Sequence, residues 1–456
     1  MEIIQTRDVS DFFAKETPAW AVYDATRKLP SFIDGLKNSQ RKLLWVGFDK
    51  LQKEYCKTET FSNIVALQTA YIHGAANLTG VCDSLTQDFI GACNYPYFLG
   101  NDGGWGSRMI PRSAAARYTK IKLANLTKVL FNSIDNEILE RQWFEGQWIE
   151  PKYLVPIFPT LFLNLSNGLT AGFSENIYSR NPKQIIKWIK KRLNGEKTPD
   201  DLPPWFKGYL GEIRWNKDQN VYESVGKIKM NNMTSYTITE IPVETTYQKY
   251  IEFLDKLEDD KVIQSYEDKC NPRTNEILFE IRTTRDFTRK HSTEDALLKV
   301  FKLVRSLPEQ YNCIDCNGKV IEFEGVSQIL ESYYQIRYDL YVRRKRFILD
   351  NLKADLEKMV SKYLFCKGII EKTLIVSNRK KDDIEKDLEK IEKIVKVDGT
   401  YDYLLRIPIS QITKEEMERL KESIKTRKDE FLLAKNKSEK DMWIEDLDKL
   451  EKELKQ

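Results

Sequence analysis

Apolar residues recur at helical spacing through the last third of the chain. Beginning at Ile329, they follow one another at steps of four, three, four and seven residues, which is typical of a coiled-coil seam. A single helix over residues 326–363 would be about 57 Å long at 1.5 Å per residue. The seam is carried by Ile329, Tyr333, Ile336, Leu340 and Phe347.

A second seam follows near residues 414–434. We expect the two helices to run antiparallel, with a smaller globular piece between them. An ordinary helical bundle would show the same spacing and stays an alternative. The second seam is carried by Met417, Leu420, Ile424 and Phe431.

The middle of the chain alternates short β-type runs with helical periods. Residues 235–241 are rich in β-branched and aromatic side chains, and a helical period follows at 247–257. The first part of the chain mixes helical patterns with clustered glycines and basic residues. These differences in sequence pattern predict a mixed α/β multidomain protein with domains at 1–155, 156–325 and 326–456.

The composition adds little about partners. The 456 residues are 41% hydrophobic and 31% charged, and the net charge is only +4, so the distribution of charge has to indicate any nucleic-acid partner. No run of about 18 apolar residues predicts a membrane span. The N-terminal residues carry acids and have no apolar core, which excludes a signal peptide.

The seven cysteines are irregularly spaced, which favours free thiols in a reducing compartment. Cys313 and Cys316 form a Cys-x-x-Cys pair, but no second pair of cysteines or histidines lies nearby in the sequence. Zinc needs four ligands. We therefore prefer a simple turn before Asn317 and Gly318 to a metal site.

One window of the chain is basic and free of acidic residues. It extends from Gly103 to Ile134. A phosphate backbone attracts clustered cations that have no carboxylates among them, although a cluster that only keeps the protein soluble is the alternative. The cations are Arg108, Arg112, Arg117, Lys120, Lys122 and Lys128.

Tyr118 lies in this window, beside Arg117 and after three alanines. A phenol has a pKa near 10, so only about one in a thousand is ionised at pH 7. A nucleophilic tyrosine needs a nearby cation or base and positive groups around the phosphorus it attacks. Arg117, with Arg108 and Arg112, offers such charges. Most of the 22 tyrosines must be half-buried core residues, so Tyr118 alone would be a weak signal.

Three shorter motifs precede Tyr118. A glycine-rich loop at residues 99–107 contains Trp105 and lacks the Gly-Lys-Ser/Thr of a Walker loop. His73 lies in a Tyr-Ile-His-Gly turn before a helical pattern at about residues 77–90, a position suited to contact with an anion. An Asp34-Gly35 turn leads into a helix with a basic start. The cations at that start are Lys37, Arg41 and Lys42.

In this order, the motifs resemble the breakage-reunion part of type IIA DNA topoisomerases, the family of gyrase A subunits, phage medium subunits and eukaryotic topoisomerase II. The resemblance rests on an Arg-x-x-Pro-x-x-x-Asp-Gly-Leu-Lys run at 27–37, the turn at His73, a Trp-Gly-Ser-Arg loop at 105–108 and an Ala-Ala-Ala-Arg-Tyr run ending at Tyr118. Later segments extend it over nearly the whole chain and look most like the eukaryotic branch. They lie at 159–176, 204–208, 238–242, 299–303, 403–408 and 441–447.

The departures from the family pattern are informative. Ala75 stands where bacterial members have an aspartate, so their drug contacts do not carry over. The sequence shows no GHKL-type ATP-binding motif and no acidic TOPRIM cluster, and its only Asp-x-Asp, at 446–448, lies in a charged C-terminal helical pattern. It shows no β-pinwheel, and its extent is similar to that of a phage medium subunit. The resemblance then implies a partner polypeptide with TOPRIM and ATPase domains, which binds the Mg²⁺ and the ATP.

The resemblance also implies the fold and the reaction. We expect a winged-helix DNA-gate domain, an α/β tower domain, and a long antiparallel coiled coil with an exit-gate globule, in a cytoplasmic homodimer (in the host cytoplasm if phage-encoded). Tyr118 would form a 5′-phosphotyrosyl link in a transient double-strand break, with Arg117 stabilising the transition state, so that the complex relaxes or decatenates DNA. Leu169, where isoleucine is usual, would wedge between base pairs. The other expected DNA contacts are Arg27, Lys37, Arg41, Lys42, His73, Trp105, Ser107 and Arg108.

Three rival functions remain. A meiotic-type strand-breaker also uses a tyrosine beside an arginine, but it should lack the tower and the exit-gate coiled coil. A tyrosine recombinase would need a His-x-x-Arg motif that this sequence does not have. A non-enzymatic coiled-coil protein of chromosome organisation would bind DNA without a covalent adduct.

Overall fold

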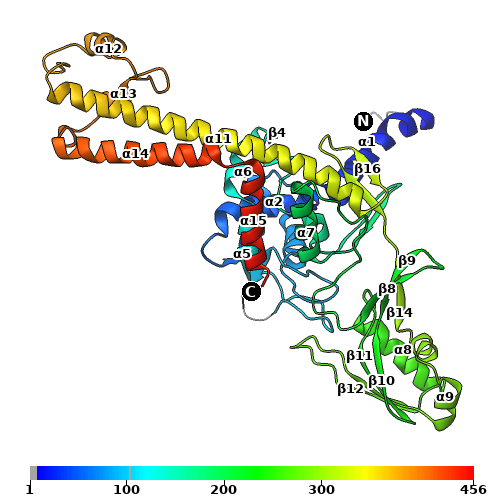
Figure 1. The fold of residues 1–456 in the computed structure, drawn as a ribbon. Coiled ribbons are helices and arrows are strands. Elements are labelled where there is room, and N and C mark those ends of the chain that lie inside the picture. The colour runs from blue at the N-terminus through cyan, green and yellow to red at the C-terminus, as the bar shows by residue number, and fades with distance from the viewer. Residues whose placement is uncertain (1–7, 102–103, 456) are drawn as a thin grey trace. The chain divides into compact units, whose positions relative to one another are not determined.

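The computed structural model describes residues 8–101 and 104–455, which fold as two compact units. The first comprises Met1–Arg337 and Asp446–Gln456, and the second comprises Tyr338–Glu445. Figure 1 shows a mixed α/β architecture, as the sequence predicts. No helix in the described ranges is long and apolar enough to cross a membrane.

The N-terminal part of the first unit contains four helices and a small antiparallel sheet of strand order β1-β3-β2. Its core is aromatic and aliphatic: Phe61 and Phe98 meet edge to face with centroids 6.0 Å apart, and Leu43 and Ile121 are fully buried. The elements are α1 (Val9–Lys28), α2 (Asn38–Lys50), β1 (Cys56–Lys57), α3 (Thr58–Gln68), α4 (Ala75–Ser84), β2 (Phe98–Gly100) and β3 (Lys120–Leu123).

Two short helices and two hairpins follow, and a third hairpin, formed by residues 311–323, comes from later in the chain. In the second hairpin, Leu169 pairs with Ser174 and Gly168 with Glu175, so the turn lies at residues 170–173. Strand β15 lies next to β7, and Asn176 exchanges backbone hydrogen bonds with Gln310 just before it. The elements are α5 (Asn125–Leu130), α6 (Ser133–Ile138), β4 (Arg141–Phe144), β5 (Gln147–Pro151), η1 (Thr160–Phe162), β6 (Ser166–Leu169), β7 (Ser174–Ile177), β15 (Tyr311–Ile314) and β16 (Val320–Phe323).

The predicted strand and helix near residues 235 and 247 are confirmed as β11 and α8. Residues along β11 alternate between half-buried and buried, because one face packs on the core around Tyr236, Tyr250 and Phe279. Two antiparallel sheets have the orders β10-β11-β13-β12 and β14-β9-β8. The elements are α7 (Pro182–Leu193), β8 (Glu212–Asn216), β9 (Val221–Val225), β10 (Lys227–Asn232), β11 (Ser235–Glu240), α8 (Tyr247–Asp259), β12 (Ser265–Asp268), β13 (Phe279–Arg282), α9 (Arg285–Lys290), α10 (Glu294–Val300) and β14 (Val304–Leu307).

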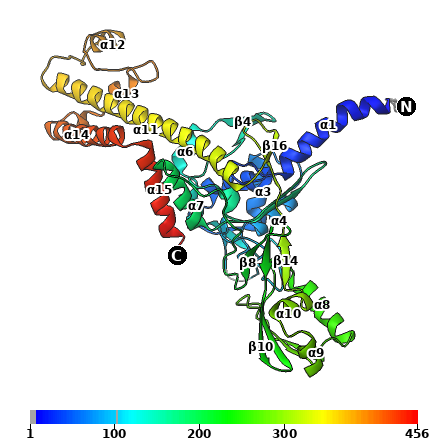
Figure 2. The same ribbon diagram turned by 45° about the vertical axis from the view of Figure 1, so that its right-hand side comes forward.

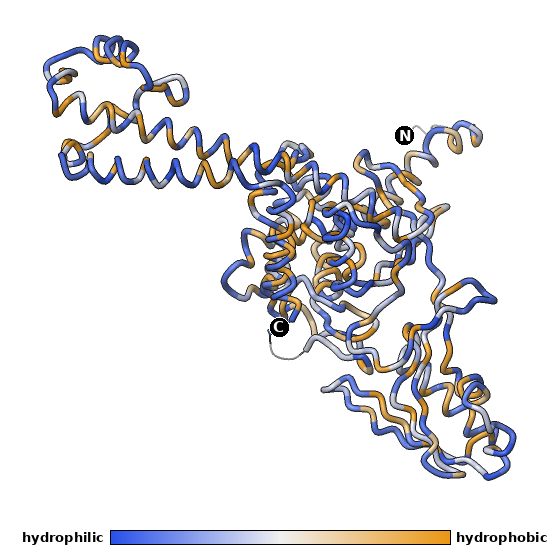
Figure 3. The backbone as a smooth tube through the Cα atoms, in the orientation of Figure 1, coloured by the Kyte–Doolittle hydropathy of each residue, from blue (hydrophilic) through white to orange (hydrophobic). Residues whose placement is uncertain are grey.

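The second unit contains α14 and most of α11, the two helices predicted from the apolar seams. Within it they run antiparallel (Figures 1 and 2), and Arg427 lies 3.9 Å from Asp355 across the pair. Figure 3 shows α14 as largely hydrophilic, and none of its residues is fully buried. A small cluster joins Phe365, near the end of α11, to Leu388 and Leu404 in the segment between the two helices. The elements from residue 326 onward, of which the start of α11 and the end of α15 belong to the first unit, are α11 (Val326–Ile370), α12 (Lys381–Glu389), α13 (Asp402–Leu405), η2 (Ile409–Gln411), α14 (Lys414–Asn436) and α15 (Glu439–Glu453).

Candidate active site

Tyr118 lies on the loop that leads into β3, and its side chain is 72% exposed. The loop is fixed beneath it. Buried Thr119 donates from its hydroxyl to the Thr58 hydroxyl over 2.8 Å, and the Glu59 amide donates to the Ala116 carbonyl over 3.3 Å. An anchored backbone therefore presents the phenol to solvent, which is the arrangement that a nucleophile for a large substrate needs.

Arg117 is the cation that lies beside the phenol. Its guanidinium carbon is 5.5 Å from the centre of the Tyr118 ring. Arg112, Arg117 and Lys120 are exposed, and Lys122 is half-buried, so several cations of the acid-free window lie at the surface on either side of Tyr118 in the sequence. Such a surface suits a polyanion.

The glycine-rich loop is shaped by Trp105. The indole lies against Gly100, where an added Cβ would be 2.2 Å from Nε1, and it donates to the Asn101 carbonyl over 3.1 Å. Gly106 has φ +81°, a conformation that favours glycine. Ser107 is buried, and its hydroxyl accepts from the Ile110 amide over 3.1 Å. In this conformation, Trp105 and Ser107 shape the loop that precedes Tyr118.

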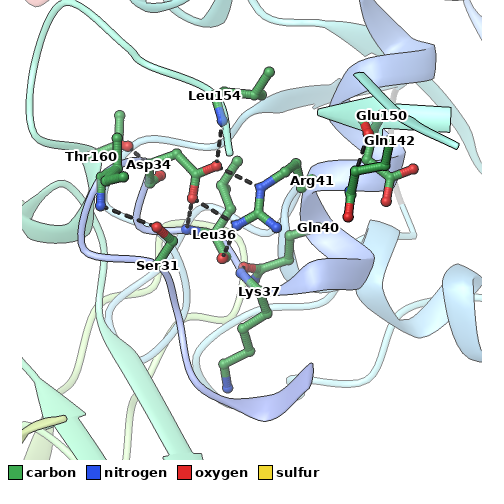
Figure 4. A network of polar contacts seen from close by, with 11 residues as sticks. Ser31, Asp34, Leu36, Lys37, Gln40, Arg41, Gln142, Glu150, Leu154 and Thr160 are labelled. Atoms are coloured by element: carbon green, nitrogen blue, oxygen red, sulfur yellow. Dashed lines mark hydrogen bonds and ion pairs between the residues drawn. The ribbon is translucent and has the colours of Figure 1, made fainter. Parts of the chain in front are cut away.

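Arg41 is held inside the protein by Asp34 (Figure 4). The guanidinium Nε donates to Asp34 Oδ2 over 2.6 Å, and the Leu36 and Leu154 amides complete the partners of a fully buried carboxylate. Gly35, at φ +61°, allows this turn, because a Cβ there would lie 2.3 Å from the Leu161 nitrogen. Arg41 therefore ties the Asp-Gly turn to α2.

Two other residues that were predicted to contact DNA also form buried ion pairs. Lys42 Nζ lies 2.8 Å from Glu150, and Arg108 lies 2.6 Å from Glu240, with less than a tenth of each side chain exposed. Charges buried in this way are satisfied within the protein. In this structure, Glu150 and Glu240 neutralise the charges of Lys42 and Arg108.

Arg27 and His73 come together at a cleft of about 260 Å³. The Tyr23 hydroxyl lies 2.7 Å from His73 Nε2. Desolvation and the nearby charge of Arg27 hold the pKa of His73 below its usual value, so the imidazole is neutral at physiological pH. Tyr118 is not among the residues that line this cleft.

Leu169 stands at the tip of the β6–β7 hairpin and is 75% exposed. Lys37, just before α2, donates from its ammonium group to the Asn167 carbonyl of the same hairpin. On the other side, the Asp24 carboxylate of α1 accepts from the Ala171 amide in the turn over 3.3 Å. The structure thus brings the predicted wedge and a predicted phosphate contact together.

Several neighbours of these residues were not predicted from the sequence. Tyr23, Asp24 and Glu175 carry no motif, and their roles depend on contacts between segments far apart in the chain. Cys316 is exposed in a turn, as the simpler interpretation expected, whereas Cys313 is buried in the preceding strand β15 and not in the turn. Among the described residues, no group of three or more His, Cys, Asp or Glu side chains is placed to hold a metal ion.

Comparison with known proteins assigns this architecture to a family. The family model for the A subunit of DNA gyrase/topoisomerase IV matches residues 27–448. The mitochondrial DNA topoisomerase 2 of Dictyostelium discoideum is 32% identical over 453 residues, covering 97% of this chain and 35% of that protein. DNA topoisomerase 2 of Invertebrate iridescent virus 6 is 27% identical, covering 97% of this chain and 39% of that protein. The chain thus spans between 35% and 39% of the length of these relatives.

A solved structure supports the same assignment. The crystal structure of the Plasmodium falciparum topoisomerase II DNA-binding, cleavage and re-ligation domain matches with a TM-score of 0.88 and 31% identity, covering 98% of this chain and 64% of that chain. The expected mixed α/β fold is therefore confirmed at the level of the whole domain. By sequence and by fold, the chain belongs to the family of type II DNA topoisomerases that includes the A subunits of DNA gyrase and topoisomerase IV.

Proposed function

We propose that this chain breaks and rejoins duplex DNA through Tyr118, as the cleavage subunit of an ATP-dependent type IIA topoisomerase. The observation that carries the proposal is the exposed phenol beside Arg117, on an anchored loop within a surface of cations. A structural tyrosine would be expected to bury its ring, whereas this ring is 72% exposed.

The reaction follows from these groups. The Tyr118 oxygen loses its proton and attacks a backbone phosphorus, the 3′ oxygen leaves and takes up a proton, and the 5′ end stays linked to the tyrosine. Arg117 stabilises the extra negative charge of the pentavalent transition state. Because the phosphotyrosyl ester conserves the energy of the broken bond, the 3′ hydroxyl rejoins the strand in the reverse step.

The exposed and half-buried residues are proposed to hold the DNA. Lys37 and Arg27 would contact phosphates, His73 would lie near the scissile region as a neutral donor, and Leu169 would wedge between base pairs. Releasing Arg41, Lys42 or Arg108 to a phosphate would break a buried pair, at a cost of about 3–5 kcal/mol. We therefore assign those three to the scaffold of the site.

We propose the family's subdomains for the three predicted domains. Residues 1–155 would form the winged-helix gate, 156–325 the tower, and 326–456 the coiled coil with the exit gate. Two copies would provide one Tyr118 for each strand and a second dimer contact, through which the transported duplex leaves. The antiparallel helices α11 and α14 support this division.

We propose that Mg²⁺ and ATP are bound by a partner polypeptide with TOPRIM and ATPase domains. The residues around Tyr118 do not fit a Mg²⁺ site, since Mg²⁺ prefers carboxylate ligands and residues 104–134 contain none. One oxygen of the Asp83 carboxylate is engaged with this loop, because it accepts a hydrogen bond from the Ser113 hydroxyl.

Trapping the covalent intermediate tests the proposal. The chain, a TOPRIM/ATPase partner, Mg²⁺ and end-labelled plasmid DNA are mixed and stopped with detergent, and protein attached to 5′ ends is measured. We expect an adduct with the wild type and none with Tyr118→Phe, whose fold is checked by thermal melting. An adduct that survives in Tyr118→Phe would overturn the proposal, and relaxation without an adduct would favour another nucleophile.

A further inference from the structure

Glu175 is a buried carboxyl group one register step below the exposed end of the β6–β7 hairpin. The residue is 2% exposed, and neither oxygen makes a well-formed hydrogen bond in the described part of the chain. A buried carboxylate without partners is strongly disfavoured, so the site must neutralise or pair it. The reaction proposed above does not use this group.

The carboxyl group and the hairpin are tightly coupled in position. Gly168 pairs with Glu175 across the hairpin, and a Cβ on Gly168 would lie 2.7 Å from the Lys28 carbonyl oxygen and 3.1 Å from Glu175 Oε2. The strand is thus held between the end of α1 and the carboxyl group. Leu169 is the next residue along this strand. Its position is therefore coupled to the position and ionisation of the Glu175 carboxyl group.

The groups around Glu175 come from four elements. Lys37, beside α2, is a cation whose charge acts on it, and the hydroxyl of Ser166 on β6 lies nearby. Cys313 of β15 is a buried thiol whose pKa is raised by burial and by Glu175. On α1, Lys28 lies 2.9 Å from Asp24 and is already paired.

The titration of Glu175 falls in the physiological range. Burial raises its pKa to about 7, while Ser166 and Lys37 oppose the shift. Burial in turn lowers the pKa of Lys37, and Glu175 opposes that shift. The Lys37 ammonium group lies on the hairpin itself, because it donates to the Asn167 carbonyl.

We propose that Glu175 is a positioning residue for the wedge, because its carboxylate and a DNA phosphate compete for the ammonium group of Lys37. This inference rests on the proposed function, since it takes Leu169 as a wedge and Lys37 as a phosphate contact. When Glu175 is ionised, it draws Lys37 to the base of the hairpin. When Glu175 is protonated, Lys37 is free to hold a phosphate, and the negative phosphate favours the protonated carboxyl group.

The direction of the pH dependence follows. Below pH 7 the carboxyl group is neutral, so DNA engagement and bending are favoured. As the pH rises through 7, the ionised form takes Lys37 back and engagement weakens, by at most about tenfold per pH unit for one linked proton. A glutamine at this position copies the neutral carboxyl group at every pH.

Bending of a duplex labelled at both ends with a fluorescence donor and acceptor tests this idea. The full chain and its Glu175→Gln, Lys37→Met and Leu169→Ala variants are titrated at pH 6.0 to 8.5. Asp88→Asn is the matched control, because burial also raises the pKa of that carboxyl group, which lies outside the hairpin. Thermal melting checks that each variant is folded.

We expect the wild type and Asp88→Asn to bend DNA less as the pH rises. Glu175→Gln should match the wild type at pH 6 and exceed it several-fold at pH 8.5, and Lys37→Met should bend weakly with no pH dependence. A Glu175→Gln profile that falls with pH as the wild type does, or lies below it throughout, would overturn the inference. Should Glu175→Gln fail to fold, a Lys37→Met profile that still falls with pH would overturn it instead. Unchanged bending by Leu169→Ala would instead reject the wedge of the proposed function.

Discussion

The cations of this chain fall into two groups that look alike in sequence and differ in the structure. Around Tyr118, Arg112, Arg117 and Lys120 are exposed. On α2 and in the loop before Tyr118, Arg41 and Arg108 are buried against Asp34 and Glu240. The difference shows that a basic residue in a motif can either stabilise the scaffold beneath a site or contact a ligand at the surface. The burial of the side chain distinguishes these two roles.

The largest effect should come from the buried group. Arg41→Ala leaves Asp34 charged, buried and without its partner, so we expect a loss of about 3–5 kcal/mol in the free energy of unfolding. Asp34→Asn keeps an acceptor for only one of the Leu36 and Leu154 amides and leaves Arg41 as the unpaired buried charge, so it should lose a similar amount. Urea unfolding measures both. A stability within about 0.5 kcal/mol of the wild type for Arg41→Ala would contradict the scaffold assignment.

Substitutions in the exposed group should lower the rate of DNA cleavage and leave the stability of the fold unchanged. Arg117→Ala should reduce DNA cleavage by about a hundredfold to a thousandfold, as loss of a charge-stabilising donor does elsewhere, with unchanged stability. Arg117→Lys should restore only part of the rate, because an ammonium group keeps the charge but not the planar fork. Single-turnover cleavage with the partner and Mg²⁺ gives the rates. Equal cleavage by Arg117→Ala and the wild type would remove Arg117 from the transition state.

Much of this fold was open to prediction from sequence, since local patterns decide local structure. The strand at β11 and the helices α8, α11 and α14 follow directly from apolar periodicity. The helical pattern after His73 continues beyond the observed end of α4 at Ser84, where the Thr86 hydroxyl bonds to the Cys82 carbonyl and the chain turns.

The candidate site was only partly predictable. Tyr118 and Arg117 are neighbours in sequence, so their pairing needs no fold. Arg108 meets Glu240 only after a strand from the middle of the chain packs against the loop, and no local pattern announces that contact. The same holds for Glu175, which becomes buried because α1, α2 and β15 close around its hairpin.

The salt dependence of DNA binding should show a smaller effect for the exposed cations around Tyr118. Removing one phosphate contact lowers the slope of log K against log salt by about 0.9. We therefore expect this change for Arg112→Ala and for Lys120→Ala, measured by fluorescence anisotropy with a short duplex. Lys386→Ala, an exposed lysine of the second unit, is the matched control and should leave the slope unchanged. Equal slopes for all variants would mean that the surface around Tyr118 does not hold the backbone.

The smallest expected effect is the loss of stability when an exposed ion pair is broken. It tests whether burial, and not the presence of a charged partner, makes the pairs of the buried group important for stability. Arg427 lies 3.9 Å from Asp355, but both side chains are more than a third exposed, so water screens their attraction. Asp355→Asn should therefore cost less than about 1 kcal/mol, and added salt should erase the difference because screening already weakens the pair. Asp34→Asn should keep its larger cost at high salt, since its pair is buried. If Asp355→Asn cost as much as Asp34→Asn, having a partner would matter more than exposure, and the assignment of Arg41 to the scaffold would lose its physical basis.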